Sequence, residues 1–285
     1  MPAFTEYAEL SNGVKIPKLG LGTWQSSPEE IDRAINTAIQ VGYENEESIG
    51  KTLKKIFDSG KVKREDVFLV TKLWVTHNRK EDVEPQLRES LKRLQTDYVD
   101  LYLIHQPVTY DHEMKEQDNS MKLEDTWAGM ETIYEKKLAR AIGVSNFNEE
   151  QIGRLLKSGK VPVHNSQVEL HLYFQQEKHV KFCHEHKITV TAYAPLGSPG
   201  RSNFVLPTGQ KLEWPDQPAP LEHPKIIPKS ITPKRIEENS QLDFTLTTEE
   251  LEELNKAPQG SRFFLQDFSI GHKEDPWKDE RPAKQ

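Results

Sequence analysis

The stretch Val67-Phe-Leu-Val-Thr-Lys-Leu-Trp74 decides the fold of this sequence. It is a mostly apolar run with a lysine near its end. Two later runs, Tyr98–His105 and Ala139–Asn146, are also mostly apolar and end in a polar residue. The segments between these runs, Val83–Leu94 and Asp125–Lys137, predict helices. Apolar strands that alternate with helices along the chain are typical of a parallel sheet.

The alternation extends toward both ends of the chain. The other strands that we expect are Lys18–Trp24, Ser166–Leu170, Ile188–Pro195 and Ile226–Ser230. The other expected helices begin at Pro28, Glu46, Glu149, Gln176, Thr232 and Thr247. Residues 1–16 predict a hairpin with its turn at Asn12-Gly13. Seven strands of this kind favour a closed (β/α)8 TIM barrel over an open doubly wound sheet.

The composition narrows the class of protein. The chain has 285 residues, of which 35% are apolar, and no linker rich in Gly, Ser or Pro divides it, so we expect a single domain over residues 1–285. The net charge of -7 argues against a nucleic-acid or anionic-membrane partner. Cys183 is the single cysteine, which fits a reducing compartment. Because no signal peptide or membrane span is visible, we expect a cytoplasmic monomer.

Polar residues stand where the predicted strands end, which is where barrel enzymes carry their chemistry. Lys72 is partly desolvated at such an end, where it can lower the pKa of a neighbouring tyrosine. It can equally be a rim lysine that reaches into solvent. His105 can donate a hydrogen bond to a carbonyl oxygen, and it can equally be a rim histidine with its own protein partner. The residues alone leave these interpretations open.

Further strand-end groups suit a nucleotide cofactor. Ser145-Asn146 and Gln167 are short polar groups that can hold a carboxamide, and Tyr193 offers a flat face on which a ring can stack. The segment Lys229–Arg235 places cations and hydroxyl groups at a helix N-terminus, which suits a phosphate. The alternative for this basic segment is an ordinary capped helix with a solvated turn.

Six strings of the chain, taken together, resemble the aldo-keto reductases. They are Gly20–Trp24 (GLGTW), Val70–Trp74 (VTKLW), Asp100–His105 (DLYLIH), Ala141–Phe147 (AIGVSNF), Ala192–Ser198 (AYAPLGS) and Ile227–Pro233 (IPKSITP). They occur in the order of the family across nearly the whole chain. The resemblance implies a barrel that binds NADPH without a Rossmann fold and reduces aldehydes or ketones to alcohols. The Gly20-Leu21-Gly22 string is accordingly not a dinucleotide fingerprint, because the third glycine and the acidic partner are lacking.

The resemblance also implies roles for individual residues. The 2′-phosphate of NADPH would be held by Lys229, Ser230, Ile231, Thr232 and Arg235, and the adenine by Glu238 and Asn239. The carboxamide would be held by Ser145, Asn146 and Gln167, the nicotinamide by Tyr193, and the pyrophosphate by Leu196 and Ser198. Thr23 and Trp24 would flank cofactor and substrate, and the substrate side would also include Trp74, Gln106 and the C-terminal loop. In the family reaction a tyrosine donates a proton, His105 orients the carbonyl and Lys72 tunes the tyrosine.

Two segments of the family pattern are absent from this chain. One is the strand after the first helix, which carries the aspartate that pairs with the lysine; here residues 41–46 run straight through it. Tyr43 is therefore either the catalytic tyrosine or the tyrosine that precedes this strand, and the following Asn45-Glu46 favours the catalytic assignment. The other is the helix before the last strand, next to Ile227. Gln106 also stands where the family usually has tryptophan, which predicts a more polar wall.

Several alternatives follow from these departures. The chain is either an isoform whose transcript skips exons, or a degenerate homologue, or a longer protein of which this sequence leaves out some segments. Its function is then NADPH-dependent carbonyl reduction, NADPH binding without turnover, or a structural role of the kind that lens crystallins have. Phe263-Phe264-Leu265 either packs on the bottom of the barrel or sets substrate specificity. The helix that carries His179, Cys183, His184 and His186 predicts a solvated surface with one buried thiol rather than a metal site.

Overall fold

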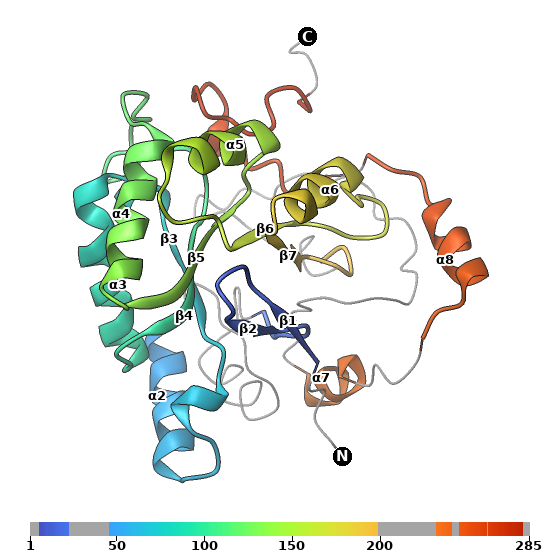
Figure 1. The fold of residues 1–285 in the computed structure, drawn as a ribbon, viewed down its shortest axis with the longest axis horizontal. Coiled ribbons are helices and arrows are strands. Elements are labelled where there is room, and N and C mark those ends of the chain that lie inside the picture. Colours follow the sequence, from blue (N-terminus) through green and yellow to red (C-terminus); the bar gives the residue numbers. More distant parts are fainter. Residues whose placement is uncertain (1–5, 23–45, 199–231, 241–244, 261, 282–285) are drawn as a thin grey trace.

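The strands of the chain form a parallel sheet in sequence order. The computed structural model describes residues 6–22, 46–198, 232–240, 245–260 and 262–281 (Figure 1). Within these residues the sheet has the order β3-β4-β5-β6-β7, with every neighbouring pair parallel. The strands are β3 (Val70–Leu73), β4 (Val99–Ile104), β5 (Ala139–Ser145), β6 (Asn165–Glu169) and β7 (Thr189–Tyr193). Consecutive parallel neighbours joined by helices are the arrangement of a (β/α)8 barrel, of which these strands form part. The predicted strand Ile226–Ser230 lies outside the described residues.

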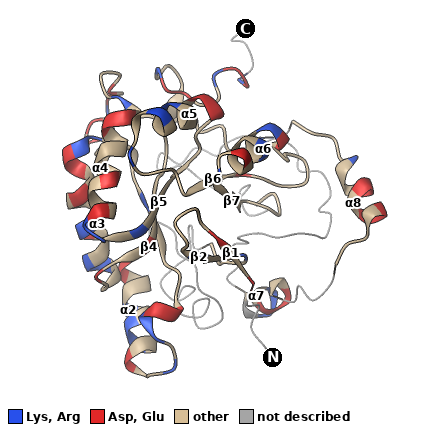
Figure 2. Cartoon of the chain, viewed as in Figure 1, with Lys and Arg blue, Asp and Glu red and all other residues tan. Residues whose placement is uncertain are grey.

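The helices pack around one side of this sheet. They are α2 (Glu46–Asp58), α3 (Lys80–Leu94), α4 (Leu123–Glu135), α5 (Glu149–Ser158) and α6 (Glu177–Glu185). Helix α3 packs between α2 and α4, and α4 also contacts α5. Two later helices are α7 (Pro233–Asn239) and α8 (Thr248–Asn255), and short 3-10 turns span Arg64–Asp66, Val75–His77 and Asp267–Ser269. Figure 2 shows that most charged residues lie on the helices and loops, whereas the strands of the sheet are mostly uncharged.

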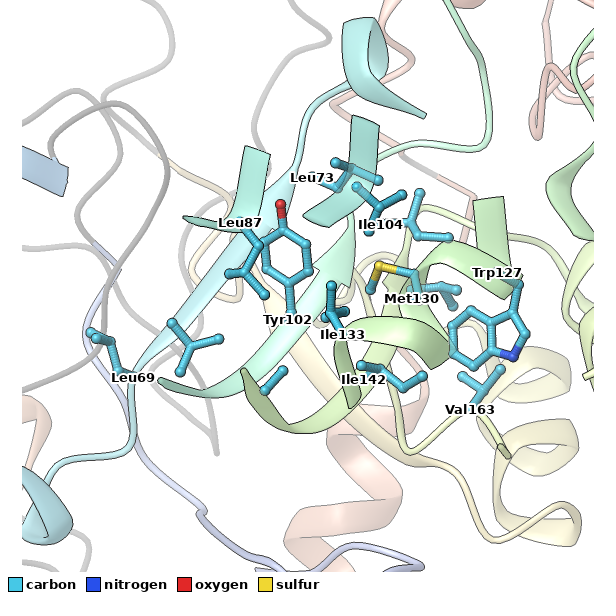
Figure 3. Close-up of a cluster of buried hydrophobic side chains, with 14 of the residues drawn as sticks. Leu69, Leu73, Leu87, Tyr102, Ile104, Trp127, Met130, Ile133, Ile142 and Val163 are labelled. Carbon is cyan, nitrogen blue, oxygen red and sulfur yellow. The ribbon is translucent and has the colours of Figure 1, made fainter. Parts of the chain in front are cut away.

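Successive residues of each strand face opposite sides of the sheet, and this alternation separates two cores. On the helix side, Tyr102, Ile142 and Val144 lie in one cluster with Leu87 of α3 and with Met130 and Trp127 of α4 (Figure 3). All of these side chains are at most 1% exposed. The Trp127 indole N–H also donates to the Val161 carbonyl at 3.1 Å. The helices are therefore held by burial of a continuous apolar face.

The other face of the sheet is covered near its N-terminal edge by a hairpin. Its strands, β1 (Tyr7–Glu9) and β2 (Lys15–Pro17), pair antiparallel, and Gly13 adopts a positive φ of 81° in the turn. Leu10 and Ile16 form an apolar cluster with residues of β3, β4 and β5. The predicted hairpin is thus confirmed within residues 6–17. The predicted strand Lys18–Trp24 is wrong for residues 18–22, which form bends and one bridge residue, because two glycines interrupt the extended run.

A buried carboxylate ties the N-terminal ends of two strands together. Asp100, whose side chain is 1% exposed, forms ion pairs with Arg64 at 2.9 Å and with Arg140 at 2.7 Å. It also accepts a hydrogen bond from the Leu69 backbone N–H at 2.9 Å. The network connects the turn before β3 with β4 and β5, at the edge opposite to the strand ends discussed below.

Candidate active site at the strand ends

The alternation of the strands places the predicted site residues on one face. Lys72 lies two residues after Val70, and His105 two residues after Leu103; both apolar residues belong to the inner cluster under the hairpin. Ser145 and Tyr193 occupy the last inward positions of β5 and β7, and Gln167 lies opposite Ser145, one inward position before the end of β6. The sequence therefore brings five of the predicted residues to the C-terminal edge of the sheet.

Asn146 connects the ends of three strands. Its backbone is in the left-handed region with φ 62°, which asparagine tolerates better than most residues. Its side-chain Nδ2 donates to the His105 carbonyl at 3.0 Å and to the Ser145 hydroxyl at 3.1 Å, and its Oδ1 accepts from the Tyr193 hydroxyl at 2.8 Å. Because Asn146 is only 4% exposed, these bonds are protected from water. The arrangement fixes β4, β5 and β7 relative to one another at this edge.

Lys72 and His105 share an environment that disfavours positive charge. Burial alone lowers the pKa of Lys72 to about 8, and the amine forms no ion pair or hydrogen bond with a described residue. Burial, and to a smaller degree the charge of Lys72, holds the pKa of His105 well below 6.5. At neutral pH His105 is therefore a neutral imidazole, which carries a single ring N–H. Most of Lys72 remains charged at neutral pH, without a carboxylate to compensate it among the described residues.

We expect the free energy of unfolding to depend on pH because of this uncompensated lysine. The folded pKa of about 8 lies below the ordinary value of 10.5, so the unfolded chain binds more protons between these pH values. Stability therefore rises with pH across this window. Between pH 7 and pH 10.5 we expect the free energy of unfolding of the wild type to rise by about 3 kcal/mol relative to that of Lys72→Met. Urea unfolding of both proteins at the two pH values measures this, and a difference that does not change with pH contradicts it.

Gln167 and Ser145 fit the carboxamide role that the resemblance implies. Gln167 is 7% exposed, yet its side-chain amide makes no hydrogen bond with another described residue. The donor and the acceptor of this amide can therefore bond a carboxamide group of a ligand. Tyr193 lies beside it, and burial raises the pKa of its hydroxyl well above 10, so the phenol stays neutral. Asn146, by contrast, already uses its amide within the protein.

The C-terminal segment, residues 262–281, lies against the same edge. Phe264 contacts Tyr193 edge-on with ring centroids 5.9 Å apart, and Phe268 lies 6.0 Å from Trp74. The Trp74 ring in turn meets His105 edge-on at 5.0 Å. Of the two alternatives for the tail, packing on the barrel bottom is thus wrong, because these residues lie at the strand ends.

Gln106 joins the tail to the site by an amide pair. Its Nε2 donates to the Oε1 of Gln266, while its own Oε1 is buried without a hydrogen-bond partner among the described residues. Gln106 is fully buried and directly follows His105. The sequence predicted a polar wall at this position, and the structure places that wall under the tail rather than in solvent.

The described residues among those predicted to hold the adenosine end are not brought to this edge. Thr23, Trp24, Tyr43, Lys229, Ser230 and Ile231 lie outside the described residues. The predicted residues Thr232, Arg235, Glu238 and Asn239 lie on α7 or its N-cap. Helix α7 packs through Ile236 on Leu21 and lies near the hairpin in Figure 1, away from residues 262–281. Leu196 and Ser198 follow β7 directly, and Leu196 is 39% exposed.

The histidine-rich helix α6 differs in part from the prediction. His184 and His186 are exposed as expected, but His179 is buried and bonds Ser166 at 3.0 Å and Glu149 at 3.1 Å. Cys183 is fully buried, and burial raises the pKa of its thiol to about 12. A solvated surface is therefore wrong for His179, because Ser166 points outward from β6 toward the helix.

Comparison with known proteins identifies the family. The model of the "Aldo/keto reductase family" matches residues 18–256. The chain belongs to the aldo/keto reductase family. It is 37% identical to "Aldo-keto reductase family 1 member A1" of Gallus gallus, with 97% of this chain and 96% of that protein covered. The match extends over 322 positions, more than the length of this chain, so the relative has internal residues without a counterpart here.

Solved structures of aldo-keto reductases share the fold. The aldose reductase of Schistosoma japonicum is 35% identical with a TM-score of 0.82, and 97% of this chain and 100% of that chain are covered. A Bombyx mori aldo-keto reductase complexed with NADPH is 30% identical with a TM-score of 0.84, and the coverage is 100% and 97%. Both are oxidoreductases with the TIM barrel fold, to which the described parallel sheet β3–β7 belongs. Among the described residues, no helix is long and apolar enough to cross a bilayer.

Proposed function

We propose that this chain reduces aldehydes or ketones to alcohols with NADPH, using Tyr43 as proton donor. The observation that carries the proposal is the pairing of a neutral His105 with a low-pKa Lys72 on the inner face of adjacent strand ends. Family membership supports the reaction, and the structure complexed with NADPH supports the cofactor. We expect the protein to be cytoplasmic and monomeric.

The proposed roles follow from the chemistry of each side chain. When bound, NADPH supplies the hydride that adds to the carbonyl carbon. Gln167 and Ser145 hold the carboxamide, and Lys229 and Arg235 hold the 2′-phosphate; Arg235 is exposed and forms no ion pair with a described residue. The neutral His105 donates a hydrogen bond that orients the carbonyl oxygen. Tyr43 delivers the proton to that oxygen, and the nearby ammonium group of Lys72 lowers the pKa of the phenol.

The position of Tyr43 in the chain agrees with this role. Helix α2 begins three residues later at Glu46, whose carboxylate accepts a hydrogen bond from the Thr71 hydroxyl at 2.7 Å. Both residues are buried, and Thr71 is the chain neighbour of Lys72. The residue three positions after Tyr43 in the sequence is therefore anchored to the strand that carries Lys72.

One observation favours a second candidate, NADPH binding without turnover. Lys72 has no carboxylate partner among the described residues, and the aspartate of the family pattern is absent from the sequence. A lysine with a pKa of about 8 is less completely charged than one beside an aspartate. It therefore stabilises a tyrosinate less, and catalysis weakens while the cofactor contacts remain.

Titration of the purified protein with NADPH, followed by an assay with an aldehyde, separates the candidates. We expect NADPH to quench the tryptophan fluorescence and to bind at least tenfold more tightly than NADH, because Lys229 and Arg235 pair with the additional phosphate. We also expect NADPH to be consumed when the aldehyde is added. Quenching without consumption supports the second candidate, and the absence of any NADPH binding refutes both candidates. Equal affinity for the two nucleotides refutes the contacts of Lys229 and Arg235 with the 2′-phosphate.

A further inference from the structure

Glu169, the last residue of β6, holds the backbone of the C-terminal segment. Its Oε1 accepts a hydrogen bond from the Phe263 N–H at 2.6 Å, and its Oε2 accepts one from the Phe264 N–H at 2.9 Å. The His171 imidazole Nε2 completes the shell at 3.0 Å from Oε1. Glu169 has no exposed surface, so these groups replace the water that a carboxylate otherwise requires.

The groups around the Glu169 carboxylate fix the geometry of its contact with the C-terminal segment. His171 stacks on Phe263 with the ring centroids 4.6 Å apart and an interplanar angle of 15°. Two consecutive N–H groups aimed at the two oxygens of one buried carboxylate fix both the position and the orientation of the peptide. A carboxylate is the side chain that supplies two acceptors at this spacing, because an amide such as glutamine offers only one.

The residues that follow this anchor lie on the proposed substrate side. Phe264 meets Tyr193, which pairs with Glu169 in the register of β6 and β7. Gln266, two residues further along, bonds Gln106 beside His105. Glu169 therefore holds the peptide segment whose side chains contact Tyr193 on β7 and Gln106 after β4.

We propose that Glu169 is a positioning residue for carbonyl binding, which acts by holding residues 262–266 over the strand ends. This inference rests on the proposed function, because it assigns the tail to the substrate side of that same site. Glu169 itself touches neither cofactor nor substrate in this proposal. Its loss accordingly weakens binding of the carbonyl compound and leaves NADPH binding and the proton donor unchanged.

The test compares Glu169→Gln and Glu169→Asp with the wild type and with Glu150→Gln as a control. Glu150 lies on α5 with its side chain 68% exposed. We expect Glu169→Gln to raise the KM for the aldehyde by about tenfold or more, as loss of a charged hydrogen bond predicts, with kcat and the Kd for NADPH within about twofold. Hydrogen exchange of peptides that cover residues 262–266 should become faster in the same variant. Glu169→Asp keeps the charge and should show smaller changes in both measurements.

The outcomes separate this inference from the proposed function. An active wild type whose KM and tail exchange are unchanged in Glu169→Gln overturns the inference alone. A loss of NADPH affinity parallel to the rise in KM also overturns it, because the effect is then not specific to the carbonyl side. If the wild type shows no turnover, the proposed function fails, and the exchange measurement still decides whether Glu169 holds the tail. If Glu169→Gln does not fold, Glu169→Asp decides, and an unchanged KM with unchanged exchange refutes the inference.

Discussion

Tyr43→Phe loses turnover by a factor of about 10² to 10⁴, the range that a general acid contributes, while it retains the wild-type affinity for NADPH. The substitution removes only the hydroxyl group, so the ring and its packing remain. His105 does not replace the proton donor, because its low pKa leaves it without a second proton at neutral pH. Steady-state assays with an aldehyde and fluorescence titration with NADPH measure the two quantities.

The matched control for this variant is Tyr7→Phe, because Tyr7 is 53% exposed on β1, away from the strand ends. It should keep both kcat and NADPH affinity. Unchanged turnover in Tyr43→Phe refutes the catalytic assignment and leaves Tyr43 as the tyrosine that precedes the absent strand. A loss of NADPH affinity together with turnover also contradicts the assignment, since it indicates a disturbed fold rather than a missing proton.

Asp100→Ala lowers the free energy of unfolding by about 3–5 kcal/mol, the cost of breaking a buried ion pair by removing one partner. The substitution leaves Arg64, whose side chain is 17% exposed, without its carboxylate, and it also leaves the Leu69 N–H unpaired. Arg140 is 46% exposed, so water can replace Asp100 as its partner and the loss of this second ion pair costs less free energy. Urea unfolding at neutral pH measures the change.

Asp58→Ala is the comparison that isolates burial from charge. Asp58 pairs with Lys54 on α2, but both side chains are more than half exposed, so we expect a change within about 0.5 kcal/mol. If Asp100→Ala were as mild as this control, the ion-pair network would not stabilise the N-terminal edge of the sheet.

The strands and the inward site residues could be predicted from the sequence because both depend on local patterns. Apolar runs predicted β3, β4 and β5, and the alternation along β3 and β4 placed Lys72 and His105 on the same face. Helix α3 nevertheless begins at Lys80, three residues before the expected start. Its first three residues, Lys80-Glu81-Asp82, are all charged, so the apolar pattern does not mark this turn.

The contacts of the tail could not be predicted, because they join residues far apart in the chain. Glu169 meets Phe263 across 94 positions, and Gln106 meets Gln266 across 160. One local signal was nevertheless present: a glutamate directly follows the buried Gln167-Val168 at the end of a strand, where a charge requires a partner. The sequence indicates that need, but it does not say which distant peptide meets it.

The hydrogen bonds of Asn146 have a consequence for how this site can change. One amide bonds the hydroxyl groups of Ser145 and Tyr193, so substitutions at these two positions share a partner. Substitutions that share a partner do not add independently. These strand-end residues therefore form an epistatic unit, in which the effect of a change on β5 depends on the residue on β7. Attempts to redesign this active site have to vary these positions together.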